Sequence, residues 1–120
     1  MTDLSSAHRT YSLQGSGLLL ASMDVAPECE EEFNKWYWEE HFPERMACPG
    51  FQWGARFQAV EGSPRYLALY VLDDPQVLET PEYRKIASPS PWTRRILPET
   101  SNLTRAVYRT ISPSNKQQNP

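Results

Sequence analysis

The order of strand-like and helix-like segments constrains the fold of this chain more than any other feature of its sequence. Four segments have the short apolar runs or the two-residue alternation typical of β-strands; they span residues 17–25, 51–60, 65–72 and 103–111. Two segments begin with helix-start signals, and they span residues 27–42 and 75–87. The order is therefore β-α-β-β-α-β. With right-handed crossovers it predicts a ferredoxin-like α+β domain, in which both helices cover one face of an antiparallel sheet.

The first helix has a clear start and a marked end. Pro27 stands at a first helical position, where its missing amide has no partner to lose, and acidic residues follow it near the positive end of the helix dipole. Pro43 disfavours a helical conformation in the residue before it, so we expect the helix to end near Phe42 and a further turn, 43–46, to follow at a kink. The second helical region is interrupted near Pro81.

The second strand segment alternates between apolar and polar residues, which is typical of a half-buried strand. Phe51, Trp53 and Phe57 belong to its apolar set, so we expect them on one face of the sheet. If both helices cover one face, the opposite face needs a second layer, and another copy of the chain is the simplest source. We therefore predict a homodimer whose two sheets pair face to face into a dimeric α/β barrel.

Composition and charge favour a single domain and exclude several classes of partner. We expect one domain over residues 15–112, between poorly ordered tails at 1–14 and 113–120, which have no sustained period. The net charge is −3 and no basic run exceeds two residues, so nucleic-acid binding is not expected. No apolar run is long enough for a secretory leader or a membrane span, so we expect a cytoplasmic protein without a membrane partner. Cys29 and Cys48 accompany no CxxC motif and are interpreted as structural.

The end of the first helix holds the best candidates for chemistry. On a helix of 3.6 residues per turn, the apolar residues of this segment form one stripe, with Glu40 inside it and His41 at its edge. A carboxylate on a sheet-facing stripe must be hydrogen-bonded, neutralised or open to a wet pocket, because a bare buried charge is too costly. A carboxylate and an imidazole at the mouth between helix and sheet are the usual groups of acid/base catalysis. His41 and Glu40 are therefore the candidate catalytic residues.

Structural interpretations of the same two residues stay open. Glu40 can pair with Arg45 or Arg56, or reach solvent where the helix ends. His41 can cap the carboxyl end of the helix, where a cationic imidazole is favoured by the dipole. His8 lies in the predicted N-terminal tail, which leaves His41 as the one histidine of the expected domain, so no multi-histidine metal site is predicted.

Aromatic residues are the candidates for lining a small-molecule pocket, although aromatic side chains on strands also build ordinary cores. The candidate substrate-binding residues are Phe33, Tyr37, Trp53, Tyr70 and Tyr83. No glycine-rich phosphate loop, HExxH or GxSxG motif is present, so neither a cofactor nor a metal is expected.

The stretch MDVAPECEEEFNKWYWEEHFPERMACPGF, followed by ARF and RYLALYVLDDPQVLETPEYRK, resembles the dimeric α/β-barrel superfamily and, within it, the EthD-like branch. The sharpest element is a W-Y-x-x-x-H-x-P signature, met by Trp36, Tyr37, His41 and Pro43. A P-G-F turn follows at residues 49–51. The likeness covers about residues 17–111.

The resemblance implies a small-molecule pocket between the helices and the sheet of each subunit, with His41 pointing into it. Relatives include polyketide cyclases, dehydratases, lactone isomerases, cofactor-free monooxygenases of quinols and anthrones, and some haem enzymes. We expect a cofactor-independent cyclase, dehydratase or isomerase acting on a hydrophobic, oxygenated aromatic or polyketide-like substrate. His41 would be the general base or acid, and Glu40 its partner. The alternatives are a non-catalytic metabolite-binding or accessory protein and a cofactor-free quinol or anthrone monooxygenase, with haem on His41 as a more distant one.

Overall fold

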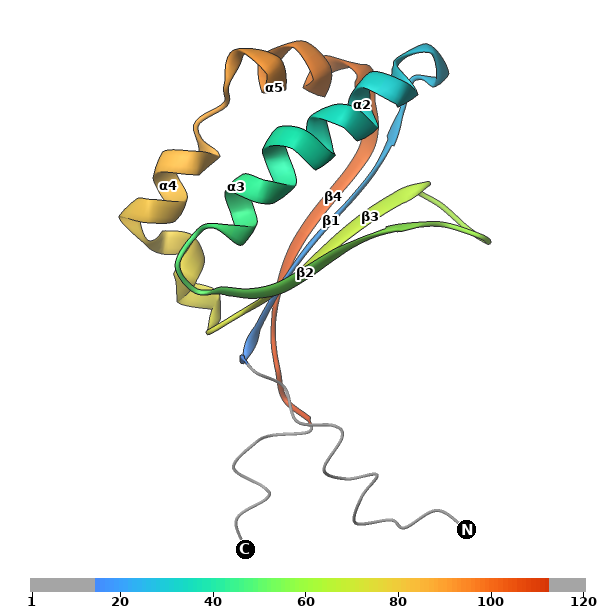
Figure 1. Ribbon diagram of the computed structural model, residues 1–120. Helices are drawn as coiled ribbons and strands as arrows, with labels where there is room; N and C mark the ends of the chain where they lie inside the picture. Colours follow the sequence, from blue (N-terminus) through green and yellow to red (C-terminus); the bar gives the residue numbers. More distant parts are fainter. Residues whose placement is uncertain (1–14, 113–120) are drawn as a thin grey trace, which may run out of the picture.

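The computed structural model describes residues 15–112, so the two predicted tails lie outside the described residues. Four strands form one antiparallel sheet in the order β2-β3-β1-β4 (Figure 1). The strands are β1 (Gly17–Val25), β2 (Phe51–Gln58), β3 (Tyr66–Leu72) and β4 (Thr100–Arg109). This topology confirms the predicted ferredoxin-like α+β fold.

The helical segments cover one face of the sheet (Figure 1). Between β1 and β2 lie η1 (Pro27–Cys29), α2 (Glu30–Trp36), η2 (Tyr37–His41) and α3 (Phe42–Met46). Between β3 and β4 lie η3 (Pro75–Glu79), α4 (Pro81–Ala87), α5 (Pro91–Ile96) and η4 (Leu97–Glu99). The described residues contain no helix that is long and apolar enough to cross a membrane.

The expected turn at 43–46 is present as part of α3, but the expected break near Phe42 is absent, because the helix passes without interruption through a π turn, η2. The backbone N–H of Phe42 donates to the carbonyl of Tyr37, five residues back, instead of four. Pro43 has no N–H to donate, and its ring crowds the turn before it, so a wider turn at this point lets the helix pass the proline. The π turn also changes the direction of the side chains after Trp36.

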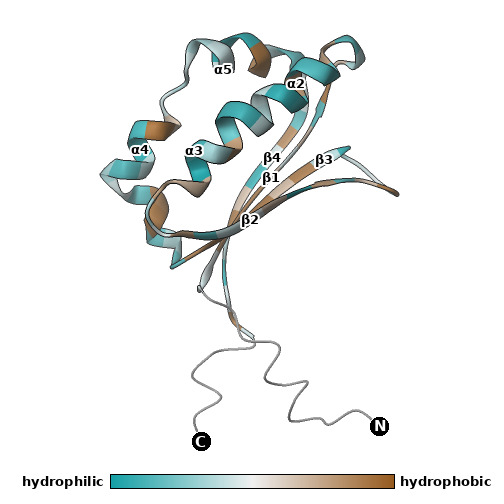
Figure 2. Cartoon of the chain, in the orientation of Figure 1, coloured by the Kyte–Doolittle hydropathy of each residue, from teal (hydrophilic) through white to brown (hydrophobic). Residues whose placement is uncertain are grey.

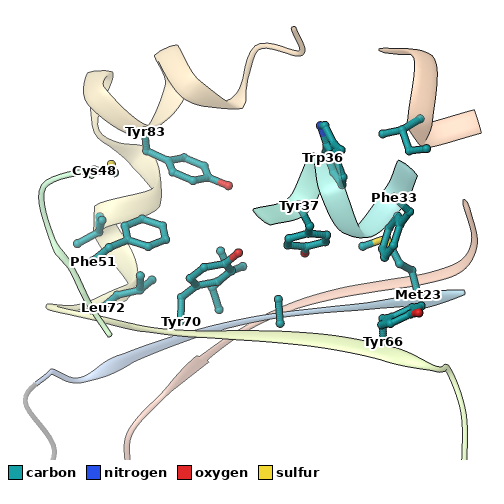
Figure 3. Packing of buried hydrophobic residues seen from close by; sticks show 14 residues of the cluster. Met23, Phe33, Trp36, Tyr37, Cys48, Phe51, Tyr66, Tyr70, Leu72 and Tyr83 are labelled. Carbon is teal, nitrogen blue, oxygen red and sulfur yellow. The ribbon is translucent and has the colours of Figure 1, made fainter. Parts of the chain in front are cut away.

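Aromatic side chains from the helices and from β3 make up most of the core (Figure 3). Burial alternates along β3, where Tyr66, Ala68, Tyr70 and Leu72 are buried toward the helices. Burying one large apolar side chain stabilises a fold by about 1.5–3 kcal/mol. The buried hydrophobic residues are Leu19, Met23, Phe33, Trp36, Tyr37, Cys48, Phe51, Tyr66, Ala68, Tyr70, Leu72, Val77, Tyr83 and Ile96.

A β-bulge divides β2 into two parts with opposite facing. Phe51 pairs with Leu72 and Trp53 pairs with Val71, so Gln52 is an extra residue in the ladder. Phe51 is therefore buried under the helices, whereas Trp53 is 51% exposed on the opposite face. The expectation that Phe51 and Trp53 share a face is wrong, because an inserted residue reverses the alternation.

The sheet face opposite the helices is apolar and lies open in the described chain. The strand registers place the same-facing residues Leu18, Leu20, Trp53, Ala55, Phe57, Leu67, Leu69, Val71, Ala106 and Tyr108 on it. Figure 2 shows hydrophobic segments along these strands. A hollow of about 240 Å³ lies at one end of this face, between Leu18, Val71 and Tyr108.

Candidate functional site

The π turn places His41 against two aromatic residues of the helix. The imidazole ring lies 4.4 Å from the Trp36 ring and 4.9 Å from the Tyr37 ring, measured between ring centres. The contact with Trp36 joins residues five apart, which is the spacing of a π turn. His41 therefore sits in the middle of a continuous helical run, which rules out the C-cap interpretation.

The surroundings of His41 keep its imidazole neutral. Burial is the main cause, and the nearby cations Arg45 and Arg56 add to it; together they lower the pKa of His41 from 6.5 to about 3. At neutral pH the ring therefore carries one N–H donor and one free nitrogen acceptor. The ring can donate or accept a hydrogen bond, but it has no extra proton to give as an acid.

Tyr70, on β3, contributes a buried hydroxyl without a partner. Its ring contacts Phe42 and Phe51 at centre distances of 5.6 and 5.5 Å. Its Oη atom makes no hydrogen bond of normal geometry, although the Tyr37 hydroxyl lies close enough to influence its pKa. Burial, followed by the nearby Tyr37, raises the pKa of Tyr70 above its ordinary value, so the phenol stays protonated. A buried donor without an acceptor costs about 1–3 kcal/mol. The group is therefore a hydrogen-bond donor that is available to a ligand.

Two further tyrosines of the same interior region, Tyr37 and Tyr83, each lie next to arginine side chains. The guanidinium of Arg56, on β2, lies 4.1 Å from the ring centre of Tyr37, and burial raises the pKa of Tyr37. Tyr83, on α4, accepts a hydrogen bond of 3.4 Å from Arg105, and the Arg45 guanidinium lies 6.0 Å from its ring centre. Figure 3 shows the hydroxyls of Tyr70 and Tyr83 directed toward the interior between them and Tyr37.

Glu40 is held by two hydroxyl groups that the sequence did not identify as its partners. Its Oε2 atom accepts hydrogen bonds from Ser90 Oγ at 2.6 Å and from Thr93 Oγ1 at 3.2 Å. Thr93 Oγ1 in turn accepts one from Trp36 Nε1 at 3.1 Å. Ser90 is the N-cap residue of α5. Glu40 thus joins the π turn to the start of α5, and it pairs with neither Arg45 nor Arg56.

The structure brings only part of the predicted set together. Tyr37, Tyr70 and Tyr83 face one interior region. His41 adjoins it through its ring contact with Tyr37, and Glu40 through Trp36 and Thr93. Phe33 lies deeper in the core, with an exposed fraction of 0%, against Trp36, Tyr37 and Tyr66. Trp53 lies on the other face of the sheet and does not reach this group.

Sequence reasoning missed the part that Arg45 and Arg56 play at this site. Arg45 is buried although it is charged, and Arg56 follows the β-bulge on the helix-facing side of β2. On a regular helix Arg45 falls outside the apolar stripe, so the helical projection gives no signal for its burial. The facing of Arg56 depends on the bulge, for which Gly54 and Gln52 give only weak local signals. Within the described ranges, no group of three His, Cys, Asp or Glu side chains is placed to hold a metal ion.

Comparison with solved structures identifies the fold. MhuD, a heme-degrader from Mycobacterium tuberculosis, has a form with manganese protoporphyrin IX bound that matches with a TM-score of 0.63 and 14% identity, over 79% of this chain and 94% of that one. A candidate antibiotic biosynthesis monooxygenase from Bordetella bronchiseptica matches with a TM-score of 0.62 and 18% identity, over 82% of this chain and 99% of that one. An ethyl tert-butyl ether degradation (EthD) family protein from Bacillus halodurans matches with a TM-score of 0.55 and 19% identity, over 79% and 99%.

No protein-family model matches the sequence, and neither does any curated protein. The structural neighbours share the ferredoxin-like fold that the resemblance implies, and an EthD family protein is among them. At these identities the likeness concerns the fold, and activity has to be argued from the site.

Proposed function

We propose that this chain is a cofactor-independent enzyme that moves a proton next to a carbonyl group of a hydrophobic, oxygenated aromatic or polyketide-like substrate. The observation that carries the proposal is the buried Tyr70 hydroxyl, which makes no hydrogen bond of normal geometry and lies near Tyr37, whose ring contacts a neutral His41. A protonated donor that the fold leaves unsatisfied is suited to an oxygen atom of the substrate. The neutral imidazole is suited to accept a proton from the adjacent carbon.

In the proposed step, the free nitrogen of His41 takes a proton from the carbon α to the carbonyl. The electron pair of the broken C–H bond becomes the enolate, whose negative charge develops on the carbonyl oxygen. Burial and the two arginines disfavour an imidazolium in the empty site. An enolate formed beside it offsets these effects, so the proton transfer becomes favourable only when the substrate supplies the negative charge.

Tyr70, Arg45 and Arg56 would stabilise that charge. A donor that is already in place where an oxyanion develops is worth about 100- to 1000-fold in rate, because no reorganisation is needed during the reaction. Both arginines act electrostatically on the Tyr70 phenol. Cyclisation, dehydration and isomerisation can each start from the enolate, and the geometry does not choose among them.

The proposal is tested by incubating the protein in D₂O with a panel of aromatic ketones and β-keto esters and following deuterium incorporation α to the carbonyl by NMR. Wild-type protein should accelerate the exchange of at least one member of the panel. The His41→Ala variant should lose about 100-fold or more of this activity, the usual contribution of a general base. Exchange that persists within a few-fold in a folded His41→Ala protein would rule out the assigned role.

A homodimer through the open sheet face belongs to the same proposal. The apolar open face, with Leu20, Leu69 and Phe57 among its residues, requires a partner layer, and a second copy buries the same surface on both subunits. This arrangement leaves the helix side of each subunit uncovered by the partner sheet.

A haem-dependent activity is the second candidate, since MhuD binds a porphyrin in the same fold. The donor set fits, because a neutral imidazole is the form of histidine that binds iron, and Arg45 and Arg56 can pair with acidic groups of the macrocycle. Bound haem would supply redox chemistry, with His41 as its ligand. An absorption spectrum of purified protein, with and without added haem, separates this candidate from proton transfer.

Binding of the panel ketones without exchange would instead indicate a metabolite-binding protein, and oxygen uptake with a quinol would indicate a cofactor-free monooxygenase.

A further inference from the structure

A groove of about 190 Å³ opens beside the proposed site, where the end of β2 meets α2. Its lining residues are Asn34, Arg56, Phe57, Gln58 and Tyr66. The Arg56 guanidinium forms the boundary between the two regions, because it lines the groove and also lies 4.1 Å from the ring centre of Tyr37. The groove therefore adjoins the proposed site through the contact of Arg56 with Tyr37.

Arg56 is partly buried and has no acidic partner. Its Nη2 atom donates to Asn34 Oδ1 at 2.9 Å, which leaves most of its five N–H donors for other groups. Across residues 15–112 the ion pairs are Arg45 with Glu44, Arg65 with Glu30 and Arg95 with Glu32, and none includes Arg56. Burial lowers the pKa of Arg56 below its ordinary value, although an arginine remains cationic at any physiological pH. Arg56 is thus a partly desolvated cation without a counter-ion.

The nearest acidic residue is already engaged. Glu30 accepts hydrogen bonds from the Tyr66 hydroxyl and from Arg65 Nε, the latter at 2.7 Å. The Asn34 amide donates to Tyr66 Oη and to the carbonyl of Glu30. These bonds hold Asn34 and Tyr66 in place as groove walls. The groove is therefore lined by a guanidinium, amides and a phenol, with no carboxylate among its lining residues.

We infer that this groove binds a carboxylate of the substrate, with Arg56 as its principal ligand. A planar carboxylate matches the guanidinium fork in a bidentate pair. That the bound carboxylate belongs to a substrate rests on the proposed function, whereas the anion site itself does not. This binding mode narrows the substrate class to hydrophobic oxo acids whose carboxylate lies at Arg56 and whose reacting carbonyl lies near Tyr70.

Binding of a carboxylate at Arg56 would also raise the basicity of the His41 imidazole. Arg56 is one of two cations that disfavour protonation of His41. A carboxylate paired with Arg56 offsets part of that positive charge, which makes the imidazole a stronger base in the complex than in the free protein. An uncharged analogue would lack this effect as well as the ion pair itself.

The test compares benzoate with its neutral analogue benzamide, by NMR titration of the full chain at pH 7 and low ionic strength. Benzoate should bind with a Kd of about 10 mM or tighter, and benzamide at least about 10-fold more weakly, because a charge-assisted pair is lost. The Arg56→Gln variant should weaken benzoate about 10- to 100-fold and leave benzamide unchanged. The Arg56→Lys variant should fall between, since an ammonium keeps the charge without the fork.

Arg84→Gln is the matched control, because Arg84 is exposed on α4 and the substitution makes the same change in net charge. It should leave benzoate binding within about twofold, and thermal unfolding should show that every variant is folded. Benzoate binding that is absent from the wild type, or that is equal in folded wild-type and Arg56→Gln proteins, overturns the inference. Arg56-dependent benzoate binding without deuterium exchange of any ketone would instead keep the anion site and overturn the enzymatic role.

Discussion

The His41 ring lies 4.4 Å from the ring of Trp36, which is five residues earlier in the chain, and the two planes are 33° apart. A regular α-helix brings residues three and four apart together, so this contact exists because the Phe42 amide reaches back to the carbonyl of Tyr37. The wider turn presses the imidazole onto an indole that is fully buried. Desolvation of His41 is thus a consequence of the backbone as much as of the neighbouring side chains.

The low pKa of His41 predicts a specific pH dependence of stability. Its pKa falls from 6.5 to about 3 on folding, so between these values the unfolded chain binds a proton that the folded chain does not. Stability from this residue is therefore complete above pH 6.5 and declines as the pH falls below it. The free energy of unfolding should fall by up to about 1.4 kcal/mol per pH unit.

Urea titrations at about pH 7 and about pH 5 check this prediction, since most carboxylates remain ionised over that interval. A His41→Gln variant should lose less stability than the wild type over the same interval, by about 1–2 kcal/mol. Equal losses in the two proteins would show that His41 is not held neutral by the fold.

Replacing Tyr70 with phenylalanine should separate function from stability. The Tyr70 hydroxyl makes no hydrogen bond, so its removal relieves an unsatisfied donor and should leave stability unchanged or raise it by about 1 kcal/mol. Deuterium exchange should nevertheless fall by about 100-fold if this hydroxyl serves the oxyanion. Tyr108→Phe removes a hydroxyl from the opposite face of the sheet, so it is the control for activity and should leave the exchange unchanged. A clear loss of stability in Tyr70→Phe would mean that the hydroxyl has a structural partner.

Glu40→Ala should weaken the junction between the π turn and α5. The carboxylate accepts hydrogen bonds from Ser90 and Thr93, and losing charge-assisted bonds of this kind costs about 1.5–3 kcal/mol. The variant should therefore melt several degrees lower, whereas Glu40→Gln, which keeps an acceptor oxygen, should lose less. Deuterium exchange by Glu40→Gln should stay within a few-fold of the wild type. Glu39→Gln, at an exposed neighbouring position, is the control. A stable Glu40→Gln protein without activity would show that Glu40 takes part in the reaction.

Charge on the open sheet face should disrupt the proposed homodimer. Leu69 lies on this face at the middle of β3, so Leu69→Lys places an ammonium where two apolar sheets would meet. Light scattering should show a dimer for the wild type and a monomer or an aggregate for the variant. Leu97→Lys, at an exposed leucine on the helix side, should leave the mass unchanged. A monomeric wild-type protein would contradict the homodimer directly.

The fold could be predicted from the sequence because local signals agree with it. The apolar run of β1 was placed at residues 17–25 and forms Gly17–Val25, and the proline and acidic residues after it do begin a helix. The unbroken course of the helix past Phe42 could not be predicted, because the rule that a proline disfavours a preceding helical residue assumes a regular turn. A π turn evades the rule by widening the helix.

The candidate site could be predicted only where it depends on one helix. The spacing of Tyr37 and His41 indicated their proximity, and the stripe indicated that Glu40 faces inward. The partners Ser90 and Thr93 come from a helix about fifty residues later, so no local pattern connects them to Glu40. The strand alternation predicts Trp53 in the pocket only if it continues through Gln52, the extra residue that reverses it.

The extra residue at Gln52 lets one edge strand serve two surfaces with opposite requirements. Before the bulge, Phe51 belongs to the core; after it, Arg56 faces the helices while Phe57 faces away from them. Without the extra residue, the same composition would put the phenylalanine side of the strand under the helices and leave the arginine on the apolar face. In a related chain, deletion of this one residue would thus turn Arg56 toward the open face and Phe57 toward the helices. The alternation of apolar and polar residues along the strand would hardly change. Comparisons of such chains should align this bulge before they align the residues that follow it.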